Sequence, residues 1–298
     1  MTGLGALIRR NVKLFFHDKG MFFTSLITPL ILLVLYGTFL AGIYRDSFTS
    51  ALPAFFSVEE SLIDATVGGQ LASSLLAVSC VTVAFCSNLL MVQDKVSGAR
   101  RDLTVSPVRR STLAVGYFCA SALTTLIVSV TAYAVCLAYL ARMGWYLSAA
   151  DVLALLLDVV LLTLFGVALS SCVNFFLSTS GQASAVGTIV SAGYGFLCGA
   201  YMPISNFSEG LQKALSFLPG TYGTSLLRNH ALRGVYAELR AAGFPDEAVE
   251  MIRDSIDCNL YFYGEKVSVP AMYLILIAAV AVLTALYVLL NVLSAKRR

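Results

Sequence analysis

The sequence contains little charge and little proline. Charged residues make up 12% of its 298 positions, whereas a typical soluble domain has about 25%. Hydrophobic residues reach 58% and fall into six separate runs rather than one core. Since most of these runs are about 20 residues or longer, they can cross the hydrocarbon of a bilayer. The composition therefore excludes a soluble globule, a disordered chain and a collagen-like chain.

Motifs of catalysis and metal binding are also missing. No glycine is followed by lysine, so the phosphate-binding loop of an ATPase cannot form. The two histidines, His17 and His230, stand in no metal-ligand spacing, and no Gly-x-Ser-x-Gly nucleophile motif occurs. We therefore expect a chain that is not itself an enzyme and that binds no metal or cofactor of its own.

Paired cysteines are missing as well. Six of the seven cysteines lie inside the hydrophobic runs, where a thiol usually acts as a small hydrophobic filler, and no Cys-x-x-Cys motif occurs. Cys258 lies outside the runs, and it is either free or bridged to a second copy of the chain.

The six hydrophobic runs predict six transmembrane helices and an all-α polytopic membrane protein. Helices satisfy every backbone group within one span, whereas barrel strands would be about 10 residues long and would alternate in polarity. The predicted spans are residues 21–43, 67–92, 113–140, 152–177, 183–203 and 269–293. The expected regions are 1–20, the first five spans in 21–203, an outer segment in 204–268, and the sixth span with its basic tail in 269–298.

The distribution of lysine and arginine orients these spans. Twelve basic residues lie in the N-terminal segment, the loop 93–112 and the C-terminal tail, whereas two lie in the short loops of the opposite side. Because short cytoplasmic loops carry the excess of basic residues, both termini are predicted to face the cytoplasm.

Residues 1–20 form an element of their own. Hydrophobic side chains recur there at three-and-four spacing, and the basic side chains lie largely on the rest of the helical wheel. This pattern predicts an amphipathic helix in the plane of the inner headgroups. It is equally typical of a charged flank that anchors the first span, and the two interpretations are compatible.

The outer segment 204–268 is too long for a simple connection. Helical stretches are expected at residues 208–217, 222–233 and 245–258, with a break at Pro219 and Gly220 and a helix end at Gly234. The first two stretches are too polar to span but keep several leucines, which favours an extracellular re-entrant hairpin between spans five and six. The alternative is a plain surface subdomain.

Polar and small residues inside the spans are candidates for the translocation path or the dimer seam. An ionised Asp158 would cost about 2.5 to 3.5 kcal/mol in the fourth span, so it contacts substrate or protons, bonds to a neighbouring helix or snorkels outward. The fifth span repeats small residues every four positions, which favours close helix packing or, alternatively, bending. The candidates are Asn88, Asp158, Gly187, Ser191, Gly195 and Gly199.

The loop 93–112 carries the most specific motif. It is a helix-competent stretch of mixed charge that is too polar to enter lipid, and it resembles the inner loop of type-2 ABC exporter permeases. That loop has an acidic residue, a glycine, a Thr-Pro pair and a following basic residue. Arg101 stands where the family often has an acid, with Asp102 next to it. The matching residues are Asp94, Gly98, Ser106, Pro107 and Arg110.

A second match follows the fifth span. The family pattern there is a glycine, an aromatic residue and a proline, then an amphipathic helix and a Pro-x-Thr-Tyr sequence. It is present at Gly199, Tyr201, Pro203 and 219–222. With six spans and an N-terminal amphipathic helix, the resemblance covers essentially the whole chain.

The resemblance implies a permease that pairs with a second permease copy, identical or paralogous, and with cytoplasmic ATPase subunits that hold ATP and Mg. The loop would form the coupling helix that docks into the ATPase, flanked by the N-terminal helix and by a smaller contact at 178–182. Spans two and five would line the path, and the outer hairpin would form the gate. The implied coupling residues are Asp94, Gly98, Arg100, Arg101, Asp102, Ser106, Pro107 and Arg110.

We therefore expect the permease subunit of a bacterial ABC exporter in the cytoplasmic membrane. It would move an amphipathic drug, peptide or lipid-like substrate outward by alternating access, as in multidrug efflux, with the lipid bilayer and no nucleic acid as a partner. Two alternatives stay open: a proton-coupled secondary transporter, and a membrane-embedded enzyme or sensor that uses Asp158. The secondary transporter would be expected to show internal repeats and several intramembrane charges, and only Asp158 lies well inside a span.

Overall fold

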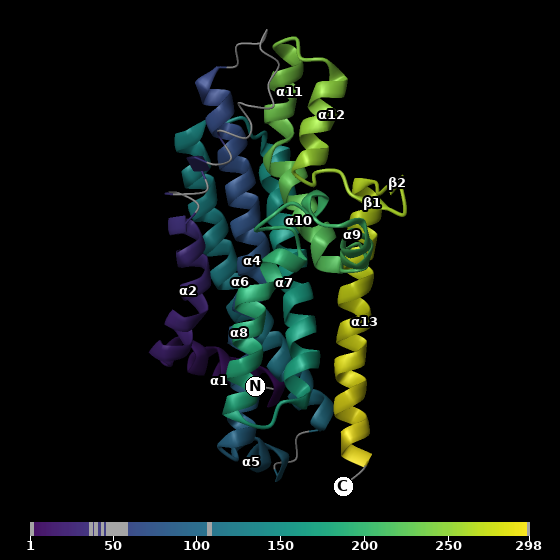
Figure 1. Ribbon diagram of the computed structural model, residues 1–298. Coiled ribbons are helices and arrows are strands. Elements are labelled where there is room, and N and C mark those ends of the chain that lie inside the picture. The colour runs from purple at the N-terminus through teal and green to yellow at the C-terminus, as the bar shows by residue number, and fades with distance from the viewer. Residues whose placement is uncertain are drawn as a thin grey trace.

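The computed structural model describes residues 3–35, 38, 41–42, 45, 59–105 and 109–296. Long helices stand side by side, and short helices lie at both ends of the bundle (Figure 1). The helices are α1 (Gly3–His17), α2 (Lys19–Leu35), α4 (Glu60–Val96), α5 (Ala99–Val105), α6 (Arg110–Met143), α7 (Ala149–Phe176), α8 (Ser180–Leu197), α9 (Glu209–Leu215), α10 (Pro219–Ala231), α11 (Arg233–Ala241), α12 (Asp246–Ser255) and α13 (Val269–Lys296). A 3-10 turn covers Ile204–Asn206, and the strands are β1 (Tyr261–Phe262) and β2 (Glu265–Lys266).

Four helices of the described chain are long and apolar enough to cross a membrane: α4, α6, α7 and α13. Helices α1 and α2 meet at a bend of 74° and give a fifth span only if the pair counts as one. Helix α8, with 18 residues, lies where the fifth span was predicted, but it is not among the four helices that are long and apolar enough to cross. The chain is therefore a polytopic helical membrane protein, and the count of six spans stays a prediction.

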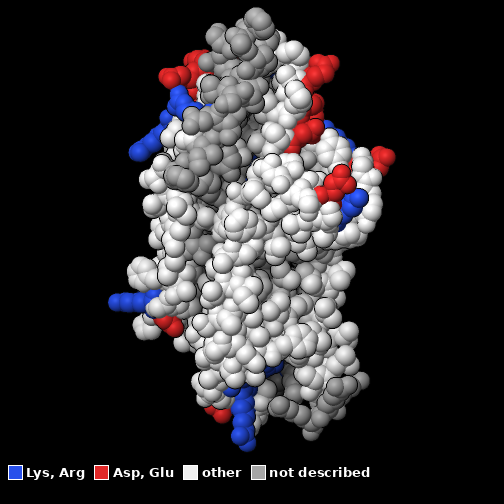
Figure 2. Space-filling view, in the orientation of Figure 1, with Lys and Arg blue, Asp and Glu red and all other residues white. Residues whose placement is uncertain are grey.

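The charged side chains on the surface are consistent with a protein that spans a membrane. On the face shown in Figure 2, blue and red side chains gather toward the two ends, and a broad uncharged band separates them. A band of this kind suits a bilayer because ionised side chains are costly in hydrocarbon.

Helix α4 is the centre of the bundle. It packs against α2, α6, α7, α8 and α10, and it is buried along nearly all of its length. At 37 residues it is about 55 Å long, so it extends beyond about 30 Å of hydrocarbon. Small residues allow the close packing: a Cβ atom at Gly166 of α7 would lie 3.0 Å from the Cα atom of Val81 in α4.

The helix ends follow local chemistry. Helix α7 begins with a capping box in which the Ser148 hydroxyl accepts from the backbone of Asp151, and the Asp151 carboxylate accepts from the backbone of Ser148. Helix α4 ends at Val96. The chain turns into α5 at Gly98, whose φ of +85° lies in the left-handed region that favours glycine.

The three helical stretches predicted for the outer segment correspond to α9, α10 and α12. The break between the first two is present, because α9 ends at Leu215 and Pro219 begins α10, as suits proline. The segment differs from its prediction at two points. Gly234 lies inside α11 rather than ending a helix, and a Cβ atom there would collide with the Tyr146 carbonyl. Tyr263 and Gly264 have φ angles of 51° and 92° and form the turn of the β1–β2 hairpin, which the all-α prediction omitted.

Helix α10 lies deep in the bundle. Every residue after Pro219 is buried, and the helix packs against α4, α7 and α13. This burial disfavours a plain surface subdomain for this part of the segment, whereas the re-entrant hairpin in the outer leaflet stays a prediction.

Candidate functional site at the inner end of the bundle

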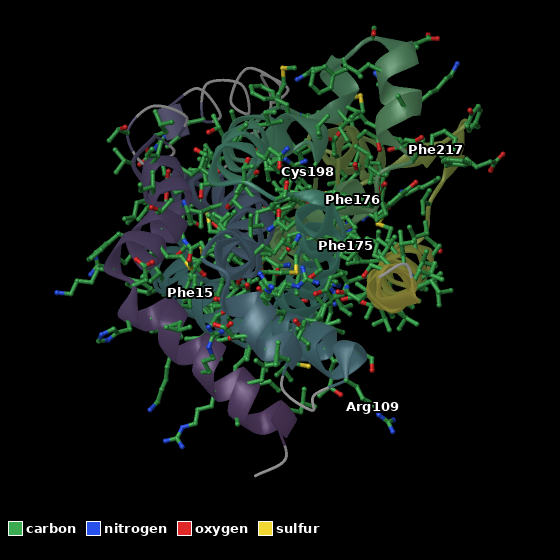
Figure 3. The ribbon with its side chains drawn as sticks, turned by 90° about the horizontal axis from the view of Figure 1, so that it is seen from below. Phe15, Arg109, Phe175, Phe176, Cys198 and Phe217 are labelled. Carbon is green, nitrogen blue, oxygen red and sulfur yellow. The ribbon has the colours of Figure 1, made fainter. Side chains whose placement is uncertain are left out.

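Helices α1 and α5 lie across the lower ends of the long helices (Figures 1 and 3). We call this the inner end, and the opposite one the outer end, after the orientation predicted from the sequence. In α1, the buried residues Leu7, Asn11 and Phe15 repeat every four positions, as expected for an amphipathic helix with one face on the bundle. Gly116 of α6 permits this close approach, because a Cβ atom there would collide with the Leu7 side chain. Sequence reasoning did not single out Gly116.

A buried carboxylate holds α1 against the bundle. Arg10 makes two hydrogen bonds to Asp94, with Nη1–Oδ2 and Nη2–Oδ1 distances of 2.7 and 3.1 Å. The Tyr117 hydroxyl donates to the same carboxylate at 2.5 Å. The hydrogen bond and charge of Asp94 raise the pKa of the Arg10 guanidinium. We name these three residues the inner clasp.

Helix α5 is the most exposed helix of this end. None of its residues is buried, and Val105 at its last position is 81% exposed. A helix of seven residues is not stable alone in water. Its attachment is Leu103, which packs against a buried cluster that includes Leu7 of α1 and Met91 of α4.

The structure divides the predicted coupling residues among different surroundings. Asp94 is buried in the inner clasp, Gly98 makes the turn between α4 and α5, and Arg100 donates to the Asn291 side chain at 3.2 Å. Arg101 and Asp102 are exposed on α5. Outside the described residues lie Ser106, Pro107 and the side chain of Arg110. Arg109, just before α6, points away from the bundle (Figure 3).

Asp158 lies in a second buried polar cluster. It is 1% exposed, which excludes snorkelling, and its carboxylate bonds to His230 Nδ1 and to the Tyr273 hydroxyl, both at 2.6 Å. The cluster joins α7, α10 and α13, so the hydrogen bond to a neighbouring helix that the sequence left open is present. His230 had no signal in the sequence because it is 72 positions away from Asp158.

The other residues assigned to the path or seam have different surroundings. The Asn88 amide donates to the Ser170 and Ser171 hydroxyls of α7 at 3.0 and 2.7 Å. A Cβ atom at Gly187 would meet nothing within 4 Å, whereas Gly195 is covered by the Tyr201 ring.

The last of the small residues predicted for the fifth span lies outside the helix. Gly199 lies beyond the end of α8 with a φ of +74°, and the Ser191 carbonyl accepts a hydrogen bond from the Tyr201 hydroxyl at 3.3 Å. The row of small residues is therefore covered toward its outer end by residues of the same chain.

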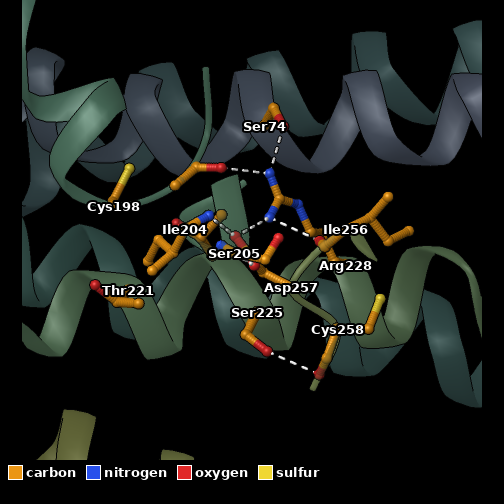
Figure 4. A network of polar contacts seen from close by, with 12 residues as sticks. Ser74, Cys198, Ile204, Ser205, Thr221, Ser225, Arg228, Ile256, Asp257 and Cys258 are labelled. Atoms are coloured by element: carbon orange, nitrogen blue, oxygen red, sulfur yellow. Dashed lines mark hydrogen bonds and ion pairs between the residues drawn. The ribbon is translucent and has the colours of Figure 1, made fainter. Parts of the chain in front are cut away.

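An arginine organises the outer end of the molecule (Figure 4). Arg228 of α10 is fully buried and donates to the carbonyls of Gly199 and Ile256 at 2.6 and 2.8 Å. It also contacts the Ser74 hydroxyl at 3.3 Å and the Asp257 carboxylate at 3.4 Å. We name this set the outer network. Nothing in the sequence indicated that an arginine of the outer segment would be completely buried.

Two further observations concern reactive and metal-binding side chains. Cys258 is a free cysteine, but it is buried and its thiol lies 3.2 Å from the Tyr236 hydroxyl, so it is not available to a reagent at the surface. Among the described residues, no group of three or more His, Cys, Asp or Glu side chains could hold a metal ion.

These features define a membrane subunit built of packed helices, with a short exposed helix attached to the inner end of its central span. The model of a family described as ABC-2 family transporter protein matches residues 47–287. The chain belongs to this family, which confirms the resemblance that the loop 93–112 indicated. The comparison with curated proteins gives no match. The family is one of membrane transport subunits whose ATPase generally resides in a separate partner.

Proposed function

We propose that this chain is the permease of an ABC exporter and that α5 is its coupling helix. The observation that carries the proposal is the combination of exposure and connection in α5. The helix buries none of its residues in its own chain, yet one glycine turn joins it to the central span. An exposed short helix at this position suits a partner that both binds it and moves it.

The contacts of α5 provide two routes for such a movement. Through Gly98 it pulls on α4, which packs against α2, α6, α7, α8 and α10. Through Leu103 it presses on the cluster that contains Leu7 of α1. Since the inner clasp fixes α1 to α4 and α6, the partner moves these elements as one body. Asp94 therefore acts by positioning α1 rather than by touching the partner.

Exposed apolar surface supports a second permease copy. Gly187 on α8 is open, and α2 and α13 expose large apolar side chains such as Phe23 and Leu274. In the assembled transporter these faces lie against lipid or against the other copy. The amphipathic substrate and outward alternating access follow from the family resemblance, with ATP and Mg held by the ATPase subunits.

The test is a charge placed on the exposed tip of α5. Val105→Glu leaves the folded chain intact because the side chain is 81% exposed, but it puts an acid into the proposed interface. We expect co-purification with the ATPase subunit and substrate-stimulated ATPase activity to fall about 10-fold or more, as for a central interface residue. Met251→Glu is the matched control, because Met251 is 69% exposed on α12 at the other end of the molecule.

Two results would contradict the proposal. One is an ATPase complex that binds V105E and M251E equally well. The other is full transport by the isolated chain under a proton gradient, which would favour the secondary transporter and direct attention to the Asp158 and His230 pair.

A further inference from the structure

A cavity of about 440 Å³ lies at the inner end, bordered by α4, α5, α6, the end of α7, α13 and the link between α7 and α8. Its charged lining consists of Lys95, Arg100 and Arg101, and its apolar lining includes Leu113 and Phe175. The volume lies in the range of small-molecule sites, about 300 to 1,000 Å³. The inner clasp lies outside this cavity, and the function proposed above assigns no ligand to it.

The three cations of this cavity have no acidic partner among the described residues. No ion pair joins any of them to a carboxylate there, although Lys95 and Arg100 are near enough to repel each other. The neighbouring Asp94 is committed to Arg10 and Tyr117. Three like charges around one cavity are unfavourable unless an anion neutralises them.

Lys95 supplies charge at a fixed position. Its ammonium donates to three carbonyls at the end of α7, those of Asn174, Phe175 and Leu177, at 2.9, 2.6 and 2.8 Å. All three donors of the ammonium are therefore used, and its charge is held at the rim of the cavity.

The arginines supply the free donors. Arg100 gives one Nη2 bond to Asn291 at 3.2 Å, and its remaining N–H groups have no described partner. Arg101 is exposed, and its guanidinium makes no described bond. Two guanidinium groups with free N–H donors suit the oxygens of a phosphate group, because arginine binds such oxygens in a fork.

The apolar walls indicate what carries this phosphate. Leu113 and Phe175 line the cavity beside the cations, and Phe176 next to them is 68% exposed. Helix α13 borders the cavity with Asn291. Only 11% of the most apolar stretch of this helix is buried, so lipid can reach this side. A phosphate with acyl chains attached matches both linings, whereas a free phosphate matches the cations alone.

We propose that this cavity binds the phosphate group of an acidic phospholipid of the inner leaflet. The bound lipid neutralises Lys95, Arg100 and Arg101 and fills the space between α5 and α13. It thereby makes the position of α5 depend on the membrane. The proposal rests on the cytoplasmic orientation of α5, but lipid binding is measured without any ATPase, so its failure is separable from failure of the proposed coupling.

The experiment measures lipid retention by native mass spectrometry of the purified chain, with phosphatidylglycerol, phosphatidylcholine and inorganic phosphate as probes. We expect phosphatidylglycerol to bind in preference to phosphatidylcholine. The double variant Arg100→Gln, Arg101→Gln is expected to weaken phosphatidylglycerol binding about 30-fold, and Arg101→Gln alone about 5-fold. The single variant serves if the double variant fails to fold, because Arg101 is exposed. The control pair Arg9→Gln, Lys13→Gln removes the same charge from α1, away from the cavity.

The outcomes separate the sources of the anion. Binding of inorganic phosphate that is as tight as that of phosphatidylglycerol overturns the lipid assignment in favour of a free anion. An equal loss in the control pair overturns the cavity in favour of diffuse attraction to basic residues. Retention of the lipid after the ATPase subunit is added supports the proposal, and its displacement assigns the cavity to the ATPase interface instead.

Discussion

The two ends of this molecule each join an arginine to a buried aspartate, but they do so in opposite ways. At the outer end, Arg228 is 0% exposed at its side chain and bonds to four residues in three other segments. At the inner end, Arg10 is 34% exposed and holds a single amphipathic helix through Asp94. The outer network is thus part of the core, whereas the inner clasp attaches an element to the rim.

This difference makes one end of the bundle rigid and leaves an element of the other end able to move. A charge that is fully desolvated and held by several partners makes its surroundings rigid, because losing any partner leaves an uncompensated buried group. Arg10 is partly exposed and returns to water when its pair with Asp94 opens, so this pair allows a helix to move. The outer end is therefore built as a fixed cap, whereas the inner end carries a helix that can separate from the bundle.

The largest effect is expected where the outer network is broken. Arg228→Met keeps the length of the side chain but leaves the buried Asp257 without its counter-charge and the Gly199 and Ile256 carbonyls without their donor. We expect a loss of about 3 to 5 kcal/mol in the free energy of unfolding, measured by denaturation in detergent. Arg240→Met, which removes a 42% exposed arginine paired with Asp246, is the control and should cost less than about 1 kcal/mol. Equal losses of unfolding free energy in both variants would contradict the role assigned to the outer network.

The second effect concerns the cluster between the two ends. Asp158→Asn removes the carboxylate that receives hydrogen bonds from His230 and Tyr273, and we expect a loss of about 1 to 3 kcal/mol in unfolding free energy. Glu238→Gln on the exposed face of α11 should leave that quantity unchanged. If D158N keeps wild-type stability but loses transport, the residue belongs to the path and not to the packing.

A smaller effect is expected at the inner clasp. Asp94→Asn should cost about 1 kcal/mol in global stability, because Arg10 is partly solvated and returns to water. Trypsin, which cleaves after arginine and lysine, should nevertheless cut α1 several-fold faster as the helix leaves the bundle. Gly116→Val should do the same by displacing Leu7, whereas Asp102→Asn should not change the rate. Unchanged cleavage in both D94N and G116V would show that the clasp does not hold α1.

The smallest effect is a pH dependence at the outer surface. Burial alone would raise the pKa of Glu250, but hydrogen bonds from Lys266 and Asn259 and the charge of Arg253 lower it to about 2. Since the folded pKa lies below the unfolded value of about 4.3, the tie between α12 and the β1–β2 hairpin is complete above that pH and is lost as the pH falls toward 2.

Hydrogen exchange of the hairpin amides tests this dependence. Glu250→Gln should exchange faster than wild type at pH 7, and the difference should vanish as the pH falls from about 4 to 2. Glu247→Gln, an exposed neighbour on α12, should behave as wild type throughout. A difference between E250Q and wild type that persists at pH 2 would contradict the assignment.

Local sequence signals located several elements well. The hydrophobic runs at 67–92, 113–140, 152–177 and 269–293 correspond to the four long helices, and the amphipathic pattern of residues 1–20 corresponds to α1. The helix-competent stretch after Gly98 is α5. These predictions held because hydrophobic length and periodicity act along the chain and need no knowledge of distant residues.

Signals that depend on distant neighbours were misread. Gly234 was predicted to end a helix, but it lies inside α11, where a Cβ atom would collide with the Tyr146 carbonyl. Asp94 was predicted to lie in a loop and to contact a partner, whereas Arg10 and Tyr117 enclose it. In each case the deciding contact comes from another part of the chain.

The sequence by itself determined that this is a helical membrane protein with a polar inner loop of the ABC-2 type, because spans and motifs are local properties of composition and spacing. Only the tertiary structure decided which polar side chains share a buried partner: Asp158 with His230, Asp94 with Arg10, and Arg228 with Asp257. The physical reason is that a buried charge is tolerated only where a complementary group meets it. That meeting is set by how the helices pack and not by their order in the chain.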